Sequence, residues 1–292
     1  MVLKNVQMQP LKNPSNFRKL SMGNWGKVGD PQVYAVLELD CENALCYIDE
    51  LRTKLDLKVT INHLVGRIIA LTLDRYPQLN GMIARRKIYL RENVDIFFQV
   101  AMEGAETELV GICIKNAHNK GIAEFAENVI RKTSKVRSSK NHPMRKSQSR
   151  FSIIPWRAMP TLVKFLNWLQ YDWNISLAWL GIPKDAMGSL MVTSVGTLGM
   201  ELVFVPLTHI GRTPGQIAVG GIYKKPVVND ADQIEIRKRL NLCCTFDHRF
   251  MDGLLASKMA KMLTAIFENP QSYCEYIEGK TAGKEFVFEA KK

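Results

Sequence analysis

The chain has 292 residues, 46% of them hydrophobic, so it can bury a full core as one large domain or two small ones. It has no apolar run of about 18 residues, which excludes a transmembrane helix. The polar segment 1–19 lacks the apolar stretch of a signal peptide, which predicts a cytoplasmic protein. The six cysteines form no Cys-x-x-Cys pair and have no histidine at metal-ligand spacing, so no metal site is expected.

The predicted elements mix helices with pairs of strands along the chain. Alternating or β-branched runs predict strands, and apolar residues three or four positions apart predict helices. Thr60 has the residue type of a helix N-cap, and Pro77 ends the helix that follows it. Because helices and strands do not alternate strictly, the order favours a layered α/β sandwich in one continuous domain. The expected strands are residues 32–39, 87–90, 94–102, 109–114, 190–194, 201–205, 216–223 and a strand ending near His248; the expected helices are 42–54, 60–76, 121–132 and 254–268.

The net charge of +12 is unevenly spread. Residues 131–150 hold eight basic side chains and no acidic one. Such a run is either a solvated loop or a surface for anions such as phosphates, an acidic protein domain or lipid head groups. No nucleic-acid-binding motif accompanies the charge, so nucleic acid is not an expected partner.

The most informative segment lies near the C-terminal end, where a strand-like run leads into His248 and Asp252-Gly253 follows four positions later. An imidazole at a strand end, held by a nearby carboxylate, is the minimal equipment of a general base. The structural alternative is a turn that happens to contain these residues. The other histidines have no comparable setting and receive no role: His63, His118, His142 and His209.

The segment Asp247-His248-Arg249 with Asp252-Gly253 resembles the Asp-His-Arg-x-x-Asp-Gly motif of the dihydrolipoamide acyltransferases, the core subunits of 2-oxo acid dehydrogenase complexes. Its shorter form, His-x-x-x-Asp-Gly, is shared with chloramphenicol acetyltransferase. The resemblance covers about residues 14–135 and 188–270. It implies a single catalytic domain over residues 1–292, folded as an α/β two-layer chloramphenicol acetyltransferase-like sandwich with a mixed sheet and helices on one face. Further segments that resemble the family, in the same order, are 17–20, 36–40, 59–62, 93–96, 197–200 and 216–220.

The resemblance also implies roles for individual residues. His248 removes a proton from the acyl acceptor, and Asp252, beside Gly253, pairs with Arg18 and fixes the loop that carries the imidazole. Replacing Asp252 with asparagine is then expected to damage folding or the geometry of His248 more than proton transfer. Ser194 corresponds to the hydroxyl that stabilises the oxyanion, with Thr193 and Thr197 as neighbours. Gly196 and Thr197 depart from the family pattern at this strand.

In the family the histidine and the hydroxyl come from neighbouring subunits, so the resemblance implies a homotrimer or a larger homo-oligomer. Coenzyme A or acyl-CoA is the implied substrate, and direct transfer through a ternary complex is expected because no cysteine stands where a covalent nucleophile should. No lipoyl domain or peripheral subunit-binding domain precedes Arg18. A lipoyl group on another chain, or another acyl carrier domain, is therefore the expected acceptor.

Residues 136–187 form an insertion that is longer than the connection expected from the family. It combines the end of the basic run with four of the five tryptophans and a helix after Pro160. Three interpretations are open: an extra helix packed on the core or across the trimer, a peripheral membrane contact through an amphipathic anchor, and a lid or tunnel for a long acyl chain.

The sequence thus predicts a CoA-dependent acyltransferase that transfers an acyl group to a thiol, hydroxyl or amine, with His248 as general base at a subunit interface. One alternative is a non-catalytic trimeric scaffold of the same fold. Another is a drug-type O-acetyltransferase that modifies small molecules. The intact His248 and Asp252 argue against the scaffold, and the Asp247-His248-Arg249 context argues for the dehydrogenase branch of the family.

Overall fold

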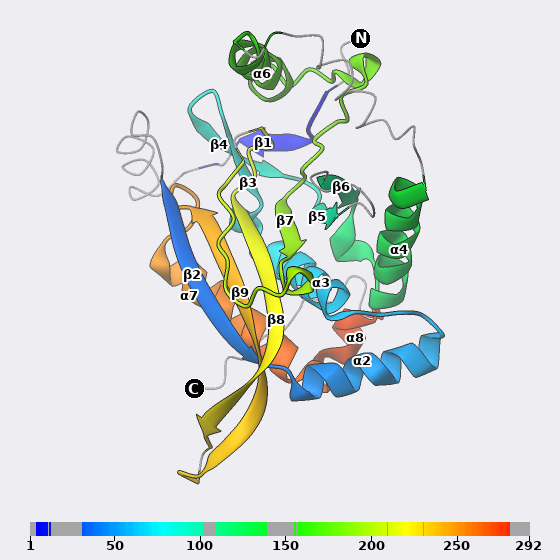
Figure 1. Ribbon diagram of the computed structural model, residues 1–292. Helices are drawn as coiled ribbons and strands as arrows, with labels where there is room; N and C mark the ends of the chain where they lie inside the picture. The colour runs from blue at the N-terminus through cyan, green and yellow to red at the C-terminus, as the bar shows by residue number, and fades with distance from the viewer. Residues whose placement is uncertain are drawn as a thin grey trace.

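The centre of the molecule is a mixed six-stranded sheet (Figure 1). The computed structural model describes residues 4–10, 12, 31–101, 109–138, 155, 157–208, 210–229 and 231–280. In the sheet, β7 pairs in parallel with both β5 and β8, and the remaining pairs are antiparallel. The strand order is β2 (Gln32–Asp40), β9 (Ile234–Asp247), β8 (Gly215–Val228), β7 (Leu190–Ser194), β5 (Ile96–Ala101) and β6 (Leu109–Ile114).

Helices cover one face of this sheet and form the main core with it. Apolar side chains of the helices, such as Ile68 and Met262, lie in one buried cluster with strand residues such as Val192 and Leu242. Burying these side chains against each other is the principal stabilising term of such a layered fold. The helices of this layer are α2 (Glu42–Leu55), α3 (Ile61–Arg75), α4 (Ile122–Ser138), α7 (Gly253–Glu268) and the short α8 (Cys274–Ile277). The predicted mixed α/β sandwich is therefore confirmed.

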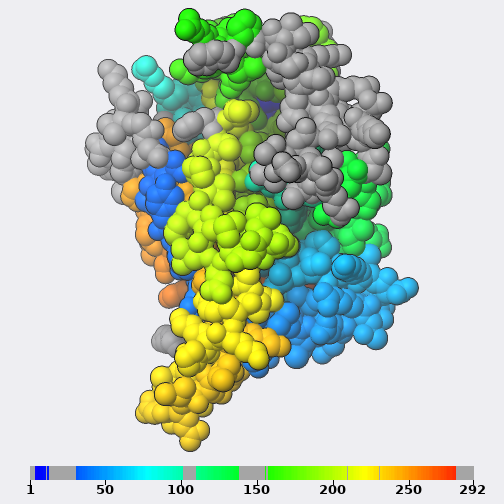
Figure 2. Space-filling model, in the orientation of Figure 1, coloured from blue at the N-terminus to red at the C-terminus, as the bar shows by residue number. Residues whose placement is uncertain are grey.

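Strands β8 and β9 continue past the sheet as a hairpin that projects from the body of the molecule (Figures 1 and 2). Their pairing has an irregularity between Val219 and Ile222, after which both strands are largely exposed. For this hairpin the sequence predicted a strand over residues 216–223 and a strand ending near His248, but not the outer half, because the polar outer half lacks the apolar face by which a strand is detected. Exposed apolar side chains on this hairpin include Val228, Ile234 and Ile236.

The predicted strand at residues 201–205 is wrong. The segment runs through 201–208 without pairing in a sheet. Val203, Phe204 and Val205 instead pack as a loop on the buried residues Val195, Ala218 and Cys243, which lie on the sheet face opposite the helices. The β-branched and aromatic residues that suggested a strand therefore serve to cover this face.

In the described part of the inserted segment, α6 (Met159–Asn167) runs directly into a π-helical turn, η3 (Trp168–Asp172). Pro160 lies in the first turn of α6, where its missing backbone N–H would have had no partner within the helix. A second, smaller sheet lies nearby, with the order β1 (Met8–Pro10), β4 (Lys87–Arg91) and β3 (Gly81–Ala84). In the described ranges, no helix combines the length and apolar character needed to cross a membrane. The remaining short helices are η1 (Pro77–Leu79), η2 (Ala117–Asn119), η4 (Ala178–Leu180), η5 (Gly196–Leu198) and η6 (Pro270–Tyr273).

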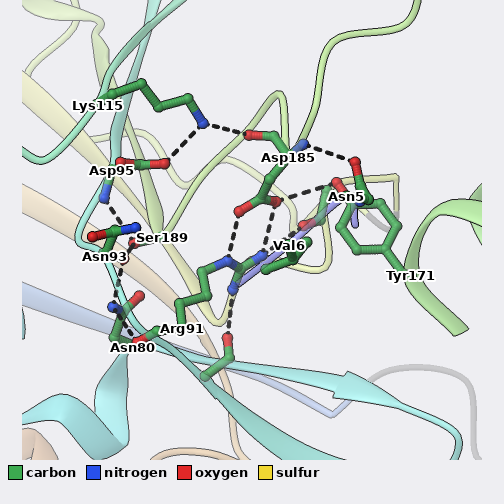
Figure 3. Close-up of polar contacts among 12 residues, drawn as sticks. Asn5, Val6, Asn80, Arg91, Asn93, Asp95, Lys115, Tyr171, Asp185 and Ser189 are labelled. Carbon is green, nitrogen blue, oxygen red and sulfur yellow. Dashed lines mark hydrogen bonds and ion pairs between the residues drawn. The ribbon is translucent and has the colours of Figure 1, made fainter. Parts of the chain in front are cut away.

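A buried ion pair joins the inserted segment to β4 (Figure 3). Arg91 Nε donates to Asp185 Oδ2 at 2.9 Å, and the two side chains are 2% and 8% exposed. Arg91 also donates to the carbonyls of Gly81 and Gly211, while the Asp185 carboxylate accepts from the Tyr171 hydroxyl. Burial lowers the pKa of the Arg91 guanidinium, but the Asp185 charge outweighs that effect, so its pKa is raised. Arg91 is therefore a fixed cation in the interior.

Helix α3 begins with a capping box that makes the fold sensitive to acid. The Thr60 hydroxyl accepts from the His63 N–H, and His63 Nδ1 accepts from the Thr60 N–H. Burial lowers the pKa of the His63 imidazole to about 4. An unfolded histidine titrates near pH 6.5, so the neutral ring contributes about 3 kcal/mol above that pH. This contribution is lost as the pH falls from about 6.5 to about 4, because only the unfolded chain takes up the proton.

We expect the unfolding free energy of the wild type to fall across this window, as measured by urea denaturation at a series of pH values. His63→Gln is the matched variant, because glutamine at this position keeps a capping box and does not titrate. The difference between the two proteins should change by up to about 3 kcal/mol over the window. Parallel pH curves for the two proteins would contradict this role of His63.

Candidate active site

His248 stands in a tight turn between β9 and α7. Its backbone N–H donates to the Pro31 carbonyl at 2.8 Å, and the Phe250 N–H donates to the Asp247 carbonyl at 3.0 Å. These bonds turn the chain sharply after Asp247, the last residue of β9. The turn places the half-buried imidazole at the end of the strand, directly before the helix, as the sequence predicted.

The orientation of the imidazole is fixed by a carbonyl group. His248 Nδ1 lies 2.6 Å from the carbonyl oxygen of Met251. A carbonyl only accepts hydrogen bonds, so Nδ1 must carry the hydrogen, and the neutral ring then has its lone pair on Nε2. The ring is thus held in the tautomer that a general base requires.

The imidazole faces an apolar pocket of about 280 Å³ between β2 and α7. Strand β2 contributes Val33, Ala35 and Leu37, and the helix contributes two alanines, Ala256 and Ala260. His248, Asp252 and Gly253 line the same pocket. The walls of the pocket were not predicted from the sequence. The sequence does contain a signal for this pocket. Two small side chains, Ala256 and Ala260, stand four residues apart on a helix face that otherwise carries leucine and methionine, and small side chains there leave room for a ligand.

Cys244 also lines this pocket, but its thiol is poorly suited to be a nucleophile. Burial raises the pKa of the Cys244 thiol to about 12. The thiolate is the reactive form of cysteine, and at neutral pH this side chain remains a thiol. The pocket chemistry therefore favours a base acting on an incoming acceptor over a covalent intermediate on cysteine.

The two carboxylates near His248 in the sequence, Asp247 and Asp252, form hydrogen bonds with groups other than the imidazole. Asp247 forms a two-pronged ion pair with Arg249, with Arg249 Nη2 donating to Asp247 Oδ2 at 2.6 Å. Asp252 is the N-cap of α7, where its Oδ1 accepts from the Leu255 N–H at 2.8 Å. Arg18, the partner expected for Asp252, lies outside the described residues, so that pairing stays a prediction. What the structure adds is that Asp252 starts the helix that closes the turn around His248.

The N-cap leads to a test that separates two roles of Asp252. Asparagine caps helices as well as aspartate does, whereas alanine costs about 1 kcal/mol. If capping is the main role, Asp252→Asn should unfold at nearly the wild-type urea concentration, and Asp252→Ala should lose about 1 kcal/mol. This revises the sequence-based expectation that asparagine would damage folding. Equal losses in both variants would show that the charge, through a partner such as Arg18, matters more than the cap.

Ser194 is at the opposite end of the sheet from His248 in the same chain. Ser194 pairs with Val219 and Val219 with Leu242, which precedes His248 by six residues along β9. At about 3.3 Å per residue, the two positions lie roughly 20 Å apart along the strand direction within one chain. The structure therefore brings His248, Asp252 and Gly253 together but not Ser194, which can meet an imidazole only if that imidazole belongs to another copy.

The departure from the family pattern beside Ser194 has a packing reason. A Cβ atom at Gly196 would lie 2.5 Å from the carbonyl oxygen of Gly220, so only glycine fits there. Thr197 Oγ1 donates to the Ser194 carbonyl at 3.1 Å and so closes the short turn after β7. Alternation along β7 places Ser194 on the same face as Val192 and places Thr193 on the other face.

The family model described as 2-oxoacid dehydrogenases acyltransferase (catalytic domain) matches residues 24–155 and 183–274. The chain belongs to this family. The match omits residues 156–182, which contain α6, η3 and η4.

Similarity to individual proteins of the acyltransferase family agrees with this assignment. The lipoamide acyltransferase component of the branched-chain alpha-keto acid dehydrogenase complex of Bacillus subtilis (strain 168) is 24% identical over 249 residues. The aligned part covers 82% of this chain and 47% of that protein. The chain thus spans about half the length of the curated relatives that it matches.

Two solved structures establish the fold. The dihydrolipoamide acetyltransferase of Azotobacter vinelandii has a TM-score of 0.62 at 18% identity, covering 91% of this chain and 93% of that one. Its study addressed a serine, a histidine and, four positions after the histidine, an asparagine in the catalytic mechanism. A chloramphenicol acetyltransferase has a TM-score of 0.55 at 11% identity, covering 89% of this chain and all of the other. The chloramphenicol acetyltransferase-like fold expected from the sequence is therefore confirmed.

Proposed function

We propose that this domain transfers an acyl group between coenzyme A and the thiol of a dihydrolipoyl group. The observation that carries the proposal is His248, held by the Met251 carbonyl in the base-competent tautomer at an apolar pocket. Family membership supports acyl transfer as the reaction. The Bacillus relative is a lipoamide acyltransferase component, which supports a dihydrolipoyl acceptor.

The proposed reaction needs one group that carries the proton and one group that donates a hydrogen bond to the oxyanion. Nε2 of His248 takes the proton of the acceptor thiol, and the thiolate sulfur attacks the thioester carbonyl of acyl-CoA. The carbonyl oxygen becomes an oxyanion, for which the Ser194 hydroxyl of a neighbouring copy is the donor. Collapse of this intermediate breaks the bond to the sulfur of coenzyme A. The departing thiolate then receives the proton from the imidazolium, which restores His248.

A homo-oligomer follows from the separation of the two residues. Ser194 and His248 are roughly 20 Å apart in one chain, so a complete site requires two copies in contact. A ring of copies related by rotation, such as a trimer, supplies this contact at each interface. The Azotobacter study addressed a serine and a histidine in the catalytic mechanism, which supports assigning the two roles to these residues.

The function is tested by following the release of free coenzyme A from acetyl-CoA and longer acyl-CoA esters with dihydrolipoamide as acceptor. Turnover that depends on dihydrolipoamide supports the proposal. A panel of alcohols and amines distinguishes the drug-type alternative, which would prefer those acceptors. A folded oligomer that transfers an acyl group to none of these acceptors would support the alternative of a non-catalytic scaffold.

We further propose that the pocket beside His248 holds the apolar part of the acyl group. Ala260→Leu narrows the pocket and should lower kcat/KM for longer acyl-CoA esters, by about fourfold for each methylene that no longer fits. Activity with acetyl-CoA should change little. Ala265→Leu, on the same helix but outside the pocket lining, is the matched control. If the variant instead raised KM for dihydrolipoamide with every donor, the pocket would belong to the acceptor.

A further inference from the structure

An aromatic cluster is exposed on the inserted segment, at the end of the molecule opposite the β8–β9 hairpin (Figure 1). Phe165 and Trp168 lie on α6 and η3 with ring centroids 6.0 Å apart, and Trp168 and Trp173 are 5.6 Å apart. The three side chains are 52%, 45% and 56% exposed. Three adjacent aromatic side chains left in water are unusual for a soluble surface and indicate a binding face.

Among the described residues, the fully exposed charges beside this cluster are basic. The tip of the β3–β4 hairpin contacts it, because the Arg85 guanidinium lies 5.8 Å from the centre of the Trp173 ring. Arg85 is followed by Arg86 and Lys87, and α6 carries Lys164 beside Phe165; all four basic side chains are exposed.

The acidic side chains of the inserted segment form ion pairs with arginine side chains. Residues 157–187 contain only two, Asp172 and Asp185. Asp172 accepts from Arg212 at 2.6 Å, and Asp185 is buried against Arg91. The solvent therefore meets aromatic rings surrounded by positive charge and no exposed carboxylate from residues 157–187.

We propose that this aromatic–basic face binds the surface of an anionic lipid membrane. Tryptophan rings favour the boundary between head groups and acyl chains, and arginine and lysine beside them attract anionic head groups. Helix α6 lies at one extremity of the molecule, the end opposite the β8–β9 hairpin (Figure 1). The aromatic residues and Lys164 belong to residues 156–182, which the family match omits, whereas Arg85, Arg86 and Lys87 lie within the matched residues. The proposal does not rest on the acyltransferase activity.

The test is flotation of the full chain with phosphatidylcholine vesicles that contain or lack phosphatidylglycerol. Binding is expected only with phosphatidylglycerol, should weaken as salt is added, and should shift tryptophan emission to shorter wavelength. Lys164→Glu should lower the partition coefficient by about fivefold or more, since one basic residue near such a surface contributes about 1 kcal/mol. The double variant Trp168→Ser, Trp173→Ser should bind still more weakly.

Two control variants lie at the opposite end of the molecule. Lys224→Glu reverses a charge, and Val228→Ser removes an exposed apolar side chain on the projecting hairpin. Both should bind vesicles like the wild type, and all variants should keep the acyl-transfer rate measured without vesicles. Absence of vesicle binding, equal binding to neutral vesicles, or unchanged binding of the tryptophan variant would each overturn the proposal. A protein partner for this face would then be the remaining explanation.

Discussion

Replacing His248 with alanine is expected to lower kcat for acyl transfer by about 10²–10⁴-fold, the usual contribution of a positioned general base. The carboxylates of the turn are engaged elsewhere, Asp247 with Arg249 and Asp252 with the Leu255 N–H, so neither is placed to replace the imidazole. The unfolding midpoint should change little, because the ring is half-buried at a pocket rather than packed in the core. Release of coenzyme A thiol measures the rate, and urea denaturation measures the stability.

Two further variants make this result specific. His248→Gln can still donate to the Met251 carbonyl but cannot act as a base, so it should lose as much activity as the alanine variant. His118→Ala, at a histidine in η2 outside the pocket, should keep its activity. Full activity in His248→Gln would show that the imidazole shapes the site without moving a proton.

The largest expected effect on stability comes from the buried pair of Arg91 and Asp185. Arg91→Met should lower the free energy of unfolding by about 3–5 kcal/mol, since it leaves a buried carboxylate without its cation. It also removes the donor from the carbonyls of Gly81 and Gly211. The loss is measured by urea denaturation of the purified protein.

Adding Asp185→Asn to Arg91→Met should recover part of this loss, because the uncompensated charge is then gone. Asparagine is the suitable replacement since Asp185 has a φ of 34°, a backbone region that asparagine tolerates better than other residues. Recovery should be incomplete, because the two glycine carbonyls remain without their donor. A loss below about 1 kcal/mol in Arg91→Met would mean that water replaces the guanidinium and that the segment is held by other contacts.

Local patterns in the sequence predicted the elements that carry the site, and the family motif predicted its chemistry. The helix after Asp252 was expected at residues 254–268 and spans Gly253–Glu268, because its cap and its apolar spacing are both local signals. Gly196, which looked like a departure, is required by the approach of the Gly220 backbone, a contact that only the folded sheet creates. The strand predicted at 201–205 is a loop, because its apolar side chains pack onto the face of the folded sheet instead of pairing with a strand.

Long-range contacts account for what the sequence could not predict. Arg91 and Asp185 are 94 positions apart and have the composition of ordinary surface charges, yet they form the buried link to the inserted segment. The pocket beside His248 depends on the spacing between β2 and α7, which lie at opposite ends of the chain. The sequence left three interpretations of the inserted segment open, because the apolar spacing of a helix does not show whether Phe165, Trp168 and Trp173 are covered or exposed.

The most direct test of the composite site is subunit complementation. His248→Ala and Ser194→Ala are each expected to be nearly inactive as pure oligomers. Co-expressed in equal amounts, they should regain about a quarter of the wild-type activity, because random assembly around a ring joins an intact histidine to a neighbour's intact serine at about a quarter of the interfaces. Co-expression of His248→Ala with Thr193→Ala should give about half of the wild-type activity, because every copy keeps Ser194 and half of the copies keep His248. Mixed oligomers that stay as inactive as the parents would contradict a site shared between two copies.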